Sequence, residues 1–226
     1  MTKGGVHFKS LVMNNDNLQK LRGIYQNEAL EITSETRDPF ALFNKWFNEA
    51  LASECLEPNA FVLSTIKNDR PRSRVVLLKG IENGDFIFYT NYDSDKGHEI
   101  DNISFVSMNF WWAPLARQVR IEGRIKKVAE SVSDDYFKKR PRGSQLGAIA
   151  SPQSKIVKDR KELEDIFEKI SKKFEHEENI PRPKNWGGFA ITADYIEFWQ
   201  GRANRLHDRV AFTKSSKGWE TNRLAP

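Results

Sequence analysis

The spacing of hydrophobic positions along this chain changes from a helical period to a strand period and back. After Asp38-Pro39, apolar residues recur every three or four positions, at Phe40, Phe43, Trp46, Phe47 and Leu51. This spacing predicts a helix that has Asp38 as its N-cap, Pro39 in its first turn and the apolar stripe in the core.

From residue 60 onward the period becomes two, which is typical of half-buried strands. Turn residues at Asn68-Asp69 and Asn83-Gly84 separate the first strands, as in hairpins. Strands are predicted over residues 61–66, 72–79, 85–90, 103–112 and 118–128. Ser94 is expected to cap a short helix that ends near Ile100. The short links between strands favour an antiparallel barrel or sandwich.

A helical section follows, and strands then resume. Ser131 or Ser133 is expected to cap a helix that ends at Lys139, and the Arg140-Pro141 step separates it from a short helix over residues 145–150. The strongest helical stripe lies within residues 159–177 and consists of Leu163, Ile166, Phe167, Ile170 and Phe174. The last strands are predicted over residues 189–192, 195–200, 206–213 and 219–224. The pattern predicts a mainly β fold with peripheral helices (α+β), with residues 38–226 as a single domain and residues 1–37 as a polar arm.

Composition narrows the class of protein without choosing a function. The chain has 226 residues, of which 38% are hydrophobic and 30% charged, so it can bury a core of its own. Its one cysteine, Cys55, cannot form an intramolecular disulfide, and no apolar run approaches the roughly 20 residues of a membrane span. The N-terminus lacks the charged-then-apolar plan of a secretion signal. We therefore expect a cytoplasmic protein without a membrane partner.

The stretch richest in candidate chemistry follows Trp199. Arg205, His207 and Arg209 alternate there. On an extended strand alternate residues share one face, so two guanidinium groups and an imidazole would point the same way. Guanidinium groups match phosphate oxygens two at a time, and an imidazole can donate or accept a proton near neutral pH. The alternative is a cationic strand face paired with acids such as Asp208.

Two other stretches combine cations with hydroxyl groups. The sequence Arg-Val-Val-Leu-Leu-Lys, from Arg74 to Lys79, places a cation on each face of an apolar strand, which is costly without an anionic partner. Hydroxyl groups and an ammonium group then lie near a helix N-terminus, an arrangement that suits a phosphate; they belong to Tyr89, Thr90, Ser94 and Lys96. A second phosphate could be held further along the chain, where Tyr136 and Arg140 lie one helical turn apart and Ser144 follows. Solvated strand ends and ordinary helix caps are the alternatives.

Several familiar kinds of site are missing from the sequence. It has no Cys-x-x-Cys or His-x-x-x-His spacing, so no metal site is expected. Glycine-rich phosphate loops and the Gly-x-Ser-x-Gly nucleophile motif are also missing. Any phosphate site must therefore be built from separate side chains that the fold brings together.

In their order and spacing, these stretches resemble the pyridoxamine 5′-phosphate oxidase family. The likeness runs from about residue 39 to the C-terminus. It is carried by Arg-Val-Val-Leu-Leu-Lys at residues 74–79, Trp-Gly-Gly-Phe at 186–189, Glu-Phe-Trp-Gln-Gly at 197–201, Arg-Leu-His-Asp-Arg at 205–209 and Arg-Leu-Ala-Pro at 223–226. The resemblance implies a split β-barrel homodimer with FMN bound across the subunit interface.

The resemblance also implies roles for individual residues. The FMN contacts would be Arg74, Val75, Val76, Leu77, Leu78, Lys79, Tyr89, Thr90, Lys96, Gln118, Gln153, Ser154, Trp199 and Arg209. The substrate would meet Arg22, Tyr25, Lys79, Tyr136, Arg140, Ser144, Arg205 and His207. Among these, Arg205 and His207 would be catalytic, and Arg22 and Tyr25 would belong to a flap in the N-terminal arm.

The chain departs from the family at two places beside these residues. Asp95 stands where the family usually has a basic residue. An acid beside an FMN phosphate would repel it unless the side chain turns away. Asn27-Glu28-Ala29 replaces a glycine pair that often follows the flap motif.

The activity that the resemblance implies is oxidation of pyridoxamine or pyridoxine 5′-phosphate to pyridoxal 5′-phosphate. FMN would take a hydride from the 4′-carbon, and O2 would reoxidise the flavin and yield H2O2. A non-catalytic protein that binds flavin or pyridoxal phosphate on the same barrel is the alternative, against which Arg205 and His207 argue. Nucleic-acid binding rests only on the net charge of +5 and the many aromatic residues, so no nucleic-acid partner is expected.

Overall fold

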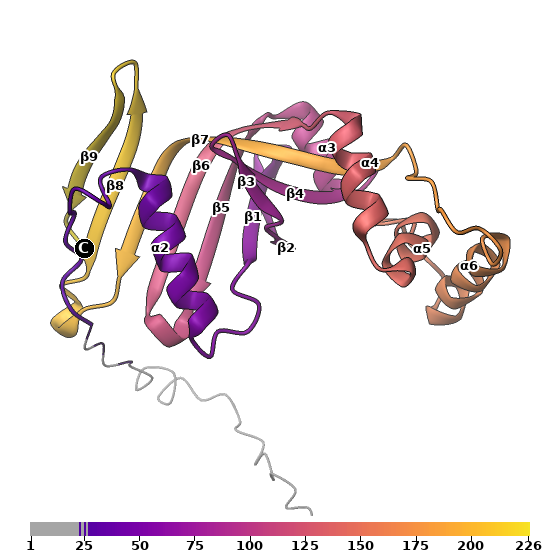
Figure 1. Cartoon of the computed structure of the whole chain (residues 1–226), viewed down its shortest axis with the longest axis horizontal. Coiled ribbons are helices and arrows are strands. Elements are labelled where there is room, and N and C mark those ends of the chain that lie inside the picture. Colours follow the sequence, from indigo (N-terminus) through magenta and orange to yellow (C-terminus); the bar gives the residue numbers. More distant parts are fainter. Residues whose placement is uncertain (1–22, 24, 26) are drawn as a thin grey trace, which may run out of the picture.

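The computed structural model describes residues 23, 25 and 27–226, and its centre is one antiparallel sheet (Figure 1). Its nine strands are β1 (Ala60–Lys67), β2 (Arg70–Leu77), β3 (Gly80–Glu82), β4 (Asp85–Asn91), β5 (Phe105–Trp112), β6 (Arg117–Lys127), β7 (Trp186–Gln200), β8 (Asp208–Ser215) and β9 (Gly218–Leu224). Their order in the sheet is β2-β1-β5-β6-β7-β4-β3, and β8 and β9 extend it from β7.

The helices of the described residues lie around the sheet. They are α2 (Pro39–Ala52), α3 (Asp95–Asn102), α4 (Glu130–Lys139), α5 (Arg142–Ala150) and α6 (Arg160–Lys173). In Figure 1, α2 lies across the sheet on the side of β8, whereas α4, α5 and α6 extend from the opposite end. Over the same residues, no helix has the length and apolar character that crossing a membrane requires. The predicted mainly β fold with peripheral helices is confirmed.

The strand path from β2 to β3 nearly closes on itself because its two end strands are neighbours in the chain. β2 forms one edge and β3 the other, and only Leu78 and Lys79 separate them. The backbone N–H of Leu78 donates to the carbonyl of Asn59, next to β1, at 2.8 Å, and that of Lys79 donates to Ile87 of β4 at 2.8 Å. The two link residues thus bond to opposite edges of the sheet, and the result is an open, split barrel.

Aromatic side chains fill the inside of this barrel. The ring of Phe43 on α2 packs edge-on against Phe86 and Phe110 at centroid distances of 5.2 and 5.3 Å. Trp46, one turn later, packs edge-on against Phe198 of β7 at 5.2 Å. Such pairs add specific geometry to the burial of apolar area, so they fix α2 against the barrel. The predicted core stripe of this helix is therefore largely confirmed.

Two details of the predicted helices need correction, one in α2 and one in α4. Asp38 caps α2 as expected, but Leu51 is 56% exposed and does not belong to the core. Neither Ser131 nor Ser133 caps α4, because both lie inside the helix. The hydroxyl of Ser133 instead accepts a hydrogen bond from the backbone N–H of Gly188 at 3.1 Å, which ties α4 to β7.

The predicted helix over residues 159–177 is confirmed over most of its length, whereas the two strands predicted in place of β7 are wrong. α6 ends at Lys173, and none of its residues is fully buried. Ile170 and Phe174, at the end of its apolar stripe, pack against a second, smaller buried cluster around Phe137. β7 is one strand of 15 residues, where two were predicted. The register between β6 and β7 shifts between Glu122 and Gly123, and Asp194 opposite has no partner. This bulge absorbs the polar residue that interrupts the apolar alternation.

Candidate active site

A cleft of about 470 Å³ lies between the barrel and the helices α4 and α5. It collects most of the ligand residues predicted between positions 74 and 154, namely Val75, Val76, Leu77, Lys79, Tyr89, Thr90, Lys96, Tyr136, Arg140, Ser144 and Gln153. Lys139, Pro141 and Trp186 complete its wall and were not predicted. Trp186 begins the Trp-Gly-Gly-Phe motif, which was the available signal for it.

One side of the cleft holds a buried ammonium group without a carboxylate partner. Lys96 is 8% exposed, and its Nζ lies 3.0 Å from Thr90 Oγ1, 3.1 Å from Ser94 Oγ and 3.0 Å from Gln153 Oε1. No carboxylate of the described residues comes within 4.0 Å of it. Burial and the nearby guanidinium of Arg74 lower the pKa of Lys96 to about 8. A buried cation surrounded by neutral acceptors is the environment expected where an anion binds.

An aromatic stack that carries a second cation forms another side of the cleft. Tyr89 and Tyr136 stack at a centroid distance of 3.8 Å, and Trp186 continues the stack 5.6 Å from Tyr89. The guanidinium of Arg140 lies 4.5 Å above the Trp186 ring, and its buried Nη1 has no hydrogen-bond partner among the described residues. Burial lowers the pKa of Arg140 and raises that of Tyr89 to about 12. An unpaired buried donor beside neutral tyrosines is suited to a second anion.

Three predicted cofactor residues lie beside the cleft without lining it. Arg74 directs its Nη2 to the carboxylate of Glu99 at 2.8 Å. Leu78 is buried in the core. Ser154 follows Gln153 in a left-handed conformation with φ of 68° and is exposed.

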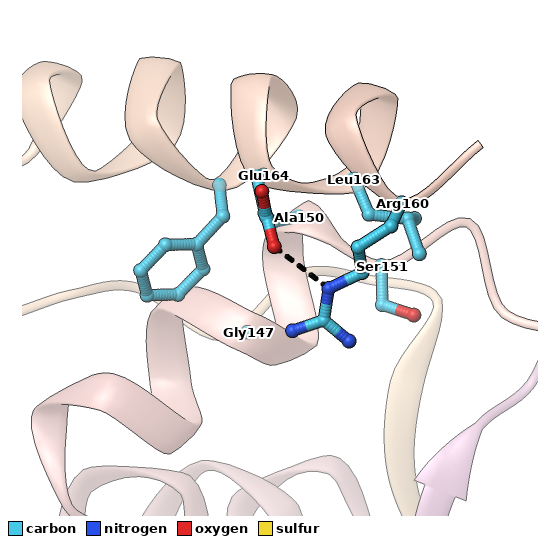
Figure 2. Close-up of a pocket in the computed structure, with 7 residues that line it drawn as sticks. Gly147, Ala150, Ser151, Arg160, Leu163 and Glu164 are labelled. Carbon is cyan, nitrogen blue, oxygen red and sulfur yellow. Dashed lines mark hydrogen bonds and ion pairs between the residues drawn. The ribbon is translucent and has the colours of Figure 1, made fainter.

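A second hollow, of about 420 Å³, lies between α5 and α6 and lacks this chemistry (Figure 2). Leu163 and Phe167 of α6 line it, opposite Gly147 of α5. Its two charged side chains, Arg160 and Glu164, pair with each other at 2.8 Å, as Figure 2 shows. The first half of the apolar stripe of α6 therefore faces this groove, which offers no unpaired cation among its lining residues to a phosphate.

Gln118 and the predicted residues from Trp199 onward gather at the other end of β7. Gln118 of β6, Trp199 of β7 and Arg209 of β8 are successive partners across three strands. The ring of His207 lies 4.7 Å from the ring of Trp199, and the ring of Tyr25 lies 5.8 Å from His207. Strand pairing thus places residues 91 positions apart in the sequence (118 to 209) on one small surface.

The predicted strand face that would carry Arg205, His207 and Arg209 together is wrong. β8 begins after His207, and Arg205 lies in a 3-10 turn with a left-handed φ of 61°. The Nδ1 atom of His207 accepts a hydrogen bond from the backbone N–H of Arg202 at 3.1 Å. Arg205 and His207 are therefore positioned by a turn and not by the alternation of side chains along a strand. Asp208, the example named in the alternative, pairs with Arg202 at 3.6 Å and Arg223 at 2.5 Å, and within the described part of the chain it forms no ion pair with Arg205 or His207.

Glu197 is a buried carboxylate that the sequence analysis did not assign. It accepts hydrogen bonds from Arg209 Nε at 2.7 Å, Arg120 Nη2 at 2.8 Å and the hydroxyl of Tyr195 at 2.9 Å. Burial alone would raise the pKa of Glu197, but these hydrogen bonds and the charges of the two arginines lower it. The ionised carboxylate therefore fixes the orientation of Arg209.

Hydrogen bonds attach the N-terminal arm to the same end of the sheet. The amide of Asn27 donates to the carbonyls of Leu115 and Gly201, both at 3.1 Å. Tyr25 lies against Gly201, where an added Cβ would come within 2.7 Å of its ring. Arg22, the other residue predicted for the flap, lies outside the described residues.

The two groups of predicted residues do not meet within one chain. Tyr89 pairs with Gly188 near one end of β7, and Arg209 pairs with Trp199 near the other, 11 residues further along (188 to 199). At about 3.3 Å per residue, roughly 36 Å of strand separates the groups. Figure 1 likewise shows β8 and α4 at opposite ends of the molecule. One chain therefore presents two half-sites.

Comparison with known proteins agrees with these observations. A family model described as pyridoxamine 5′-phosphate oxidase matches residues 47–174, and one described as the pyridoxine 5′-phosphate oxidase C-terminal dimerisation region matches residues 186–226. A pyridoxine/pyridoxamine 5′-phosphate oxidase of Synechocystis sp. is 49% identical over 95% of this chain and 100% of its own length. One from Leptospira interrogans is 48% identical over 92% of this chain and 98% of its own.

Solved structures share the fold. PhzG from Burkholderia lata 383, in complex with tetrahydrophenazine-1-carboxylic acid, is 27% identical with a TM-score of 0.83, covering 90% of this chain and 100% of that one. An FMN-binding protein from Nostoc punctiforme, related to pyridoxamine 5′-phosphate oxidase, has a TM-score of 0.67 at 13% identity and covers 85% of this chain and 100% of its own. The motifs, the split barrel and the sequence matches together place this chain in the pyridoxamine 5′-phosphate oxidase family.

Proposed function

We propose that this protein is an FMN-dependent oxidase that converts pyridoxamine 5′-phosphate and pyridoxine 5′-phosphate to pyridoxal 5′-phosphate. The observation that carries the proposal is the buried ammonium of Lys96, which has no carboxylate partner in the described part of the chain and faces the same cleft as the unpaired guanidinium of Arg140. Two phosphorylated ring compounds require two anion sites close together, with aromatic surfaces between them. The cleft provides the two anion sites and the aromatic surfaces.

The side chains of the cleft fit the parts of FMN. Lys96 and Arg74 would hold its phosphate, and residues 75–79 with Tyr89 and Thr90 would lie along the rest of the molecule. From the other half-site, Gln118, Trp199 and Arg209 would contact it. When bound, FMN supplies a two-electron acceptor that O2 can reoxidise. The protein supplies orientation and a fixed electrostatic environment.

We propose a homodimer as the functional unit. Two observations support it, namely the match to the family's C-terminal dimerisation region and the roughly 36 Å of strand between the two half-sites of one chain. In a two-fold dimer, the cleft of one chain can meet the Trp199 and Arg209 end of its partner, so two complete sites form together.

Tyr136, Arg140 and Ser144 would bind the substrate phosphate, while Arg205 and His207 would orient the 4′-carbon over the flavin. The net reactions balance in both cases. Pyridoxamine 5′-phosphate, O2 and water give pyridoxal 5′-phosphate, ammonia and H2O2, and pyridoxine 5′-phosphate with O2 gives pyridoxal 5′-phosphate and H2O2. Tyr25, which lies against His207, would cover the substrate on the side of the arm.

The test is a turnover assay on purified protein saturated with FMN. Pyridoxamine 5′-phosphate should yield pyridoxal 5′-phosphate and H2O2 in equal amounts. A protein that stays colourless after incubation with FMN would overturn the cofactor assignment. Bound flavin that neither substrate bleaches under anaerobic conditions would favour the non-catalytic flavin-binding alternative.

A further inference from the structure

We infer that Arg72, a residue outside the cleft, is a positioning residue that keeps the phosphate-binding end of the cleft cationic by neutralising the two carboxylates of α3, Asp95 and Glu99. The inference rests on the proposed FMN site. It concerns a cluster of charged side chains on β2 and α3, immediately beside Lys96.

Glu99 is the buried member of this cluster. It is 3% exposed, and its Oε2 accepts hydrogen bonds from Arg74 Nη2 at 2.8 Å and from the hydroxyl of Thr65 at 2.5 Å. Its Oε1 lies 3.5 Å from Arg72 Nη1. A buried carboxylate one turn of helix from Lys96 would otherwise cancel the charge that an anion needs. Here its charge is shared between two arginines of β2.

Asp95 is the exposed member, and it precedes Lys96 in the sequence. Its carboxylate lies 3.1 Å from the same Nη1 of Arg72, so Arg72 bridges both acids. The side chains of Arg72 and Asp95 are 45% and 48% exposed, and an ion pair this open contributes little to the stability of the fold. Its consequence is electrostatic, because it draws the negative charge of Asp95 toward β2 and leaves Lys96 without a counter-ion.

The charges of the cluster show why one arginine matters. Arg72, Arg74 and Lys96 carry three positive charges against the two negative charges of Asp95 and Glu99, which leaves one positive charge. Without Arg72 the sum is zero, and Asp95 would repel a phosphate that carries about two negative charges. At separations of several ångströms in a partly solvated site, one such charge changes the affinity for the phosphate roughly three- to thirty-fold.

The experiment compares FMN with riboflavin, which has the same ring system and no phosphate. Dissociation constants are measured by quenching of flavin fluorescence with protein stripped of flavin, at low ionic strength. We expect Arg72→Ala to weaken FMN binding roughly three- to thirty-fold and to leave riboflavin binding unchanged. Asp95→Asn should tighten FMN binding in the wild-type background and restore it in Arg72→Ala. Arg70→Ala is the matched control, because it removes an exposed arginine of the same strand for which the described residues provide no ion pair.

Equal losses of FMN and riboflavin affinity in Arg72→Ala, without rescue by Asp95→Asn, would overturn the inference and indicate a structural role. FMN affinity that falls no further in Arg72→Ala than in Arg70→Ala would also overturn it. Either result would leave the proposed function standing, because wild-type protein would still bind FMN. Wild-type protein that binds no FMN would refute the cofactor assignment itself, and with it this inference.

Discussion

The Nδ1 atom of His207 accepts a hydrogen bond from the backbone N–H of Arg202 at 3.1 Å, so the proton of the neutral imidazole lies on Nε2. If this Nε2–H contacts the substrate, His207→Gln should keep more activity than His207→Asn. The amide nitrogen of glutamine can take the place of Nε2, whereas asparagine reaches only the place of Nδ1.

We expect kcat to fall roughly tenfold in His207→Gln and about a hundredfold in His207→Asn and in Arg205→Ala, with FMN content unchanged. Steady-state kinetics and flavin absorbance of the purified variants measure both quantities. Loss of flavin in these variants, with turnover per bound flavin intact, would contradict the catalytic role.

Hybrid dimers can test whether the two half-sites come from different chains. Arg140→Ala impairs the cleft and His207→Ala impairs the opposite end of β7, so each homodimer should be nearly inactive. Co-expression gives hybrids in half of the dimers, and each hybrid contains one intact site, so about a quarter of the wild-type activity should return.

Arg140→Ala with Lys96→Ala is the control pair for this experiment. Both substitutions fall in the cleft, so their hybrid has no intact site and should recover nothing. Equal activity from the two co-expressed pairs would show that one chain builds its own complete site.

FMN affinity should depend on pH through Lys96. Burial lowers the pKa of Lys96 to about 8 in the protein without ligand, and a bound phosphate raises it because it favours the ammonium form. Binding is therefore strongest below about pH 8, and above it the affinity should fall by up to about tenfold per pH unit. Fluorescence titrations between about pH 7 and 9.5 measure this dependence. Lys96→Arg should make the profile flat, because a guanidinium keeps its charge there; a flat wild-type profile would contradict the assignment.

The position of Tyr25 over His207 predicts a role in substrate binding. In Gly201→Ala the new Cβ would come within 2.7 Å of the Tyr25 ring and displace it. We expect KM for pyridoxamine 5′-phosphate to rise roughly five- to tenfold, because a displaced ring no longer covers the substrate. In a Tyr25→Ala background the same substitution should add almost nothing. Additive effects of the two substitutions would argue against the flap.

Two glycine substitutions that add the same methyl group should change stability in opposite directions. At Gly123, beside the bulge of β6, a Cβ would overlap the carbonyl oxygen of Thr192, so Gly123→Ala should cost about 2–4 kcal/mol. At Gly147, inside α5, a Cβ meets no atom within 4 Å, so Gly147→Ala should stabilise by about 0.5–1 kcal/mol. Urea unfolding of the protein without ligand measures both. A stable Gly123→Ala protein would mean that the bulge can move.

Local sequence patterns predicted the structure correctly wherever it depends on residues that are neighbours in the chain. The Asp38-Pro39 helix start, the Ser94 cap and the hairpin turn at Asn83-Gly84 could all be read from the sequence, because caps and turns are made by residues a few positions apart. The order and spacing of the motifs also identified the family, and with it most of the residues that line the cleft.

Long-range relationships were decided by the tertiary structure alone. Whether Arg205 and His207 share a strand face depends on where β8 begins, and the period-two rule holds only inside a strand. The apolar stripe of α6 was visible in the sequence, but only the packing of distant elements determines that Leu163 and Phe167 face a groove while Ile170 and Phe174 pack against a buried cluster. Likewise, Asp95 looked unfavourable for a phosphate until the fold placed Arg72, 23 residues earlier in the chain, beside it. Charged side chains and apolar surfaces contact residues that are distant in the sequence, and sequence spacing carries no information about which distant residues lie close together.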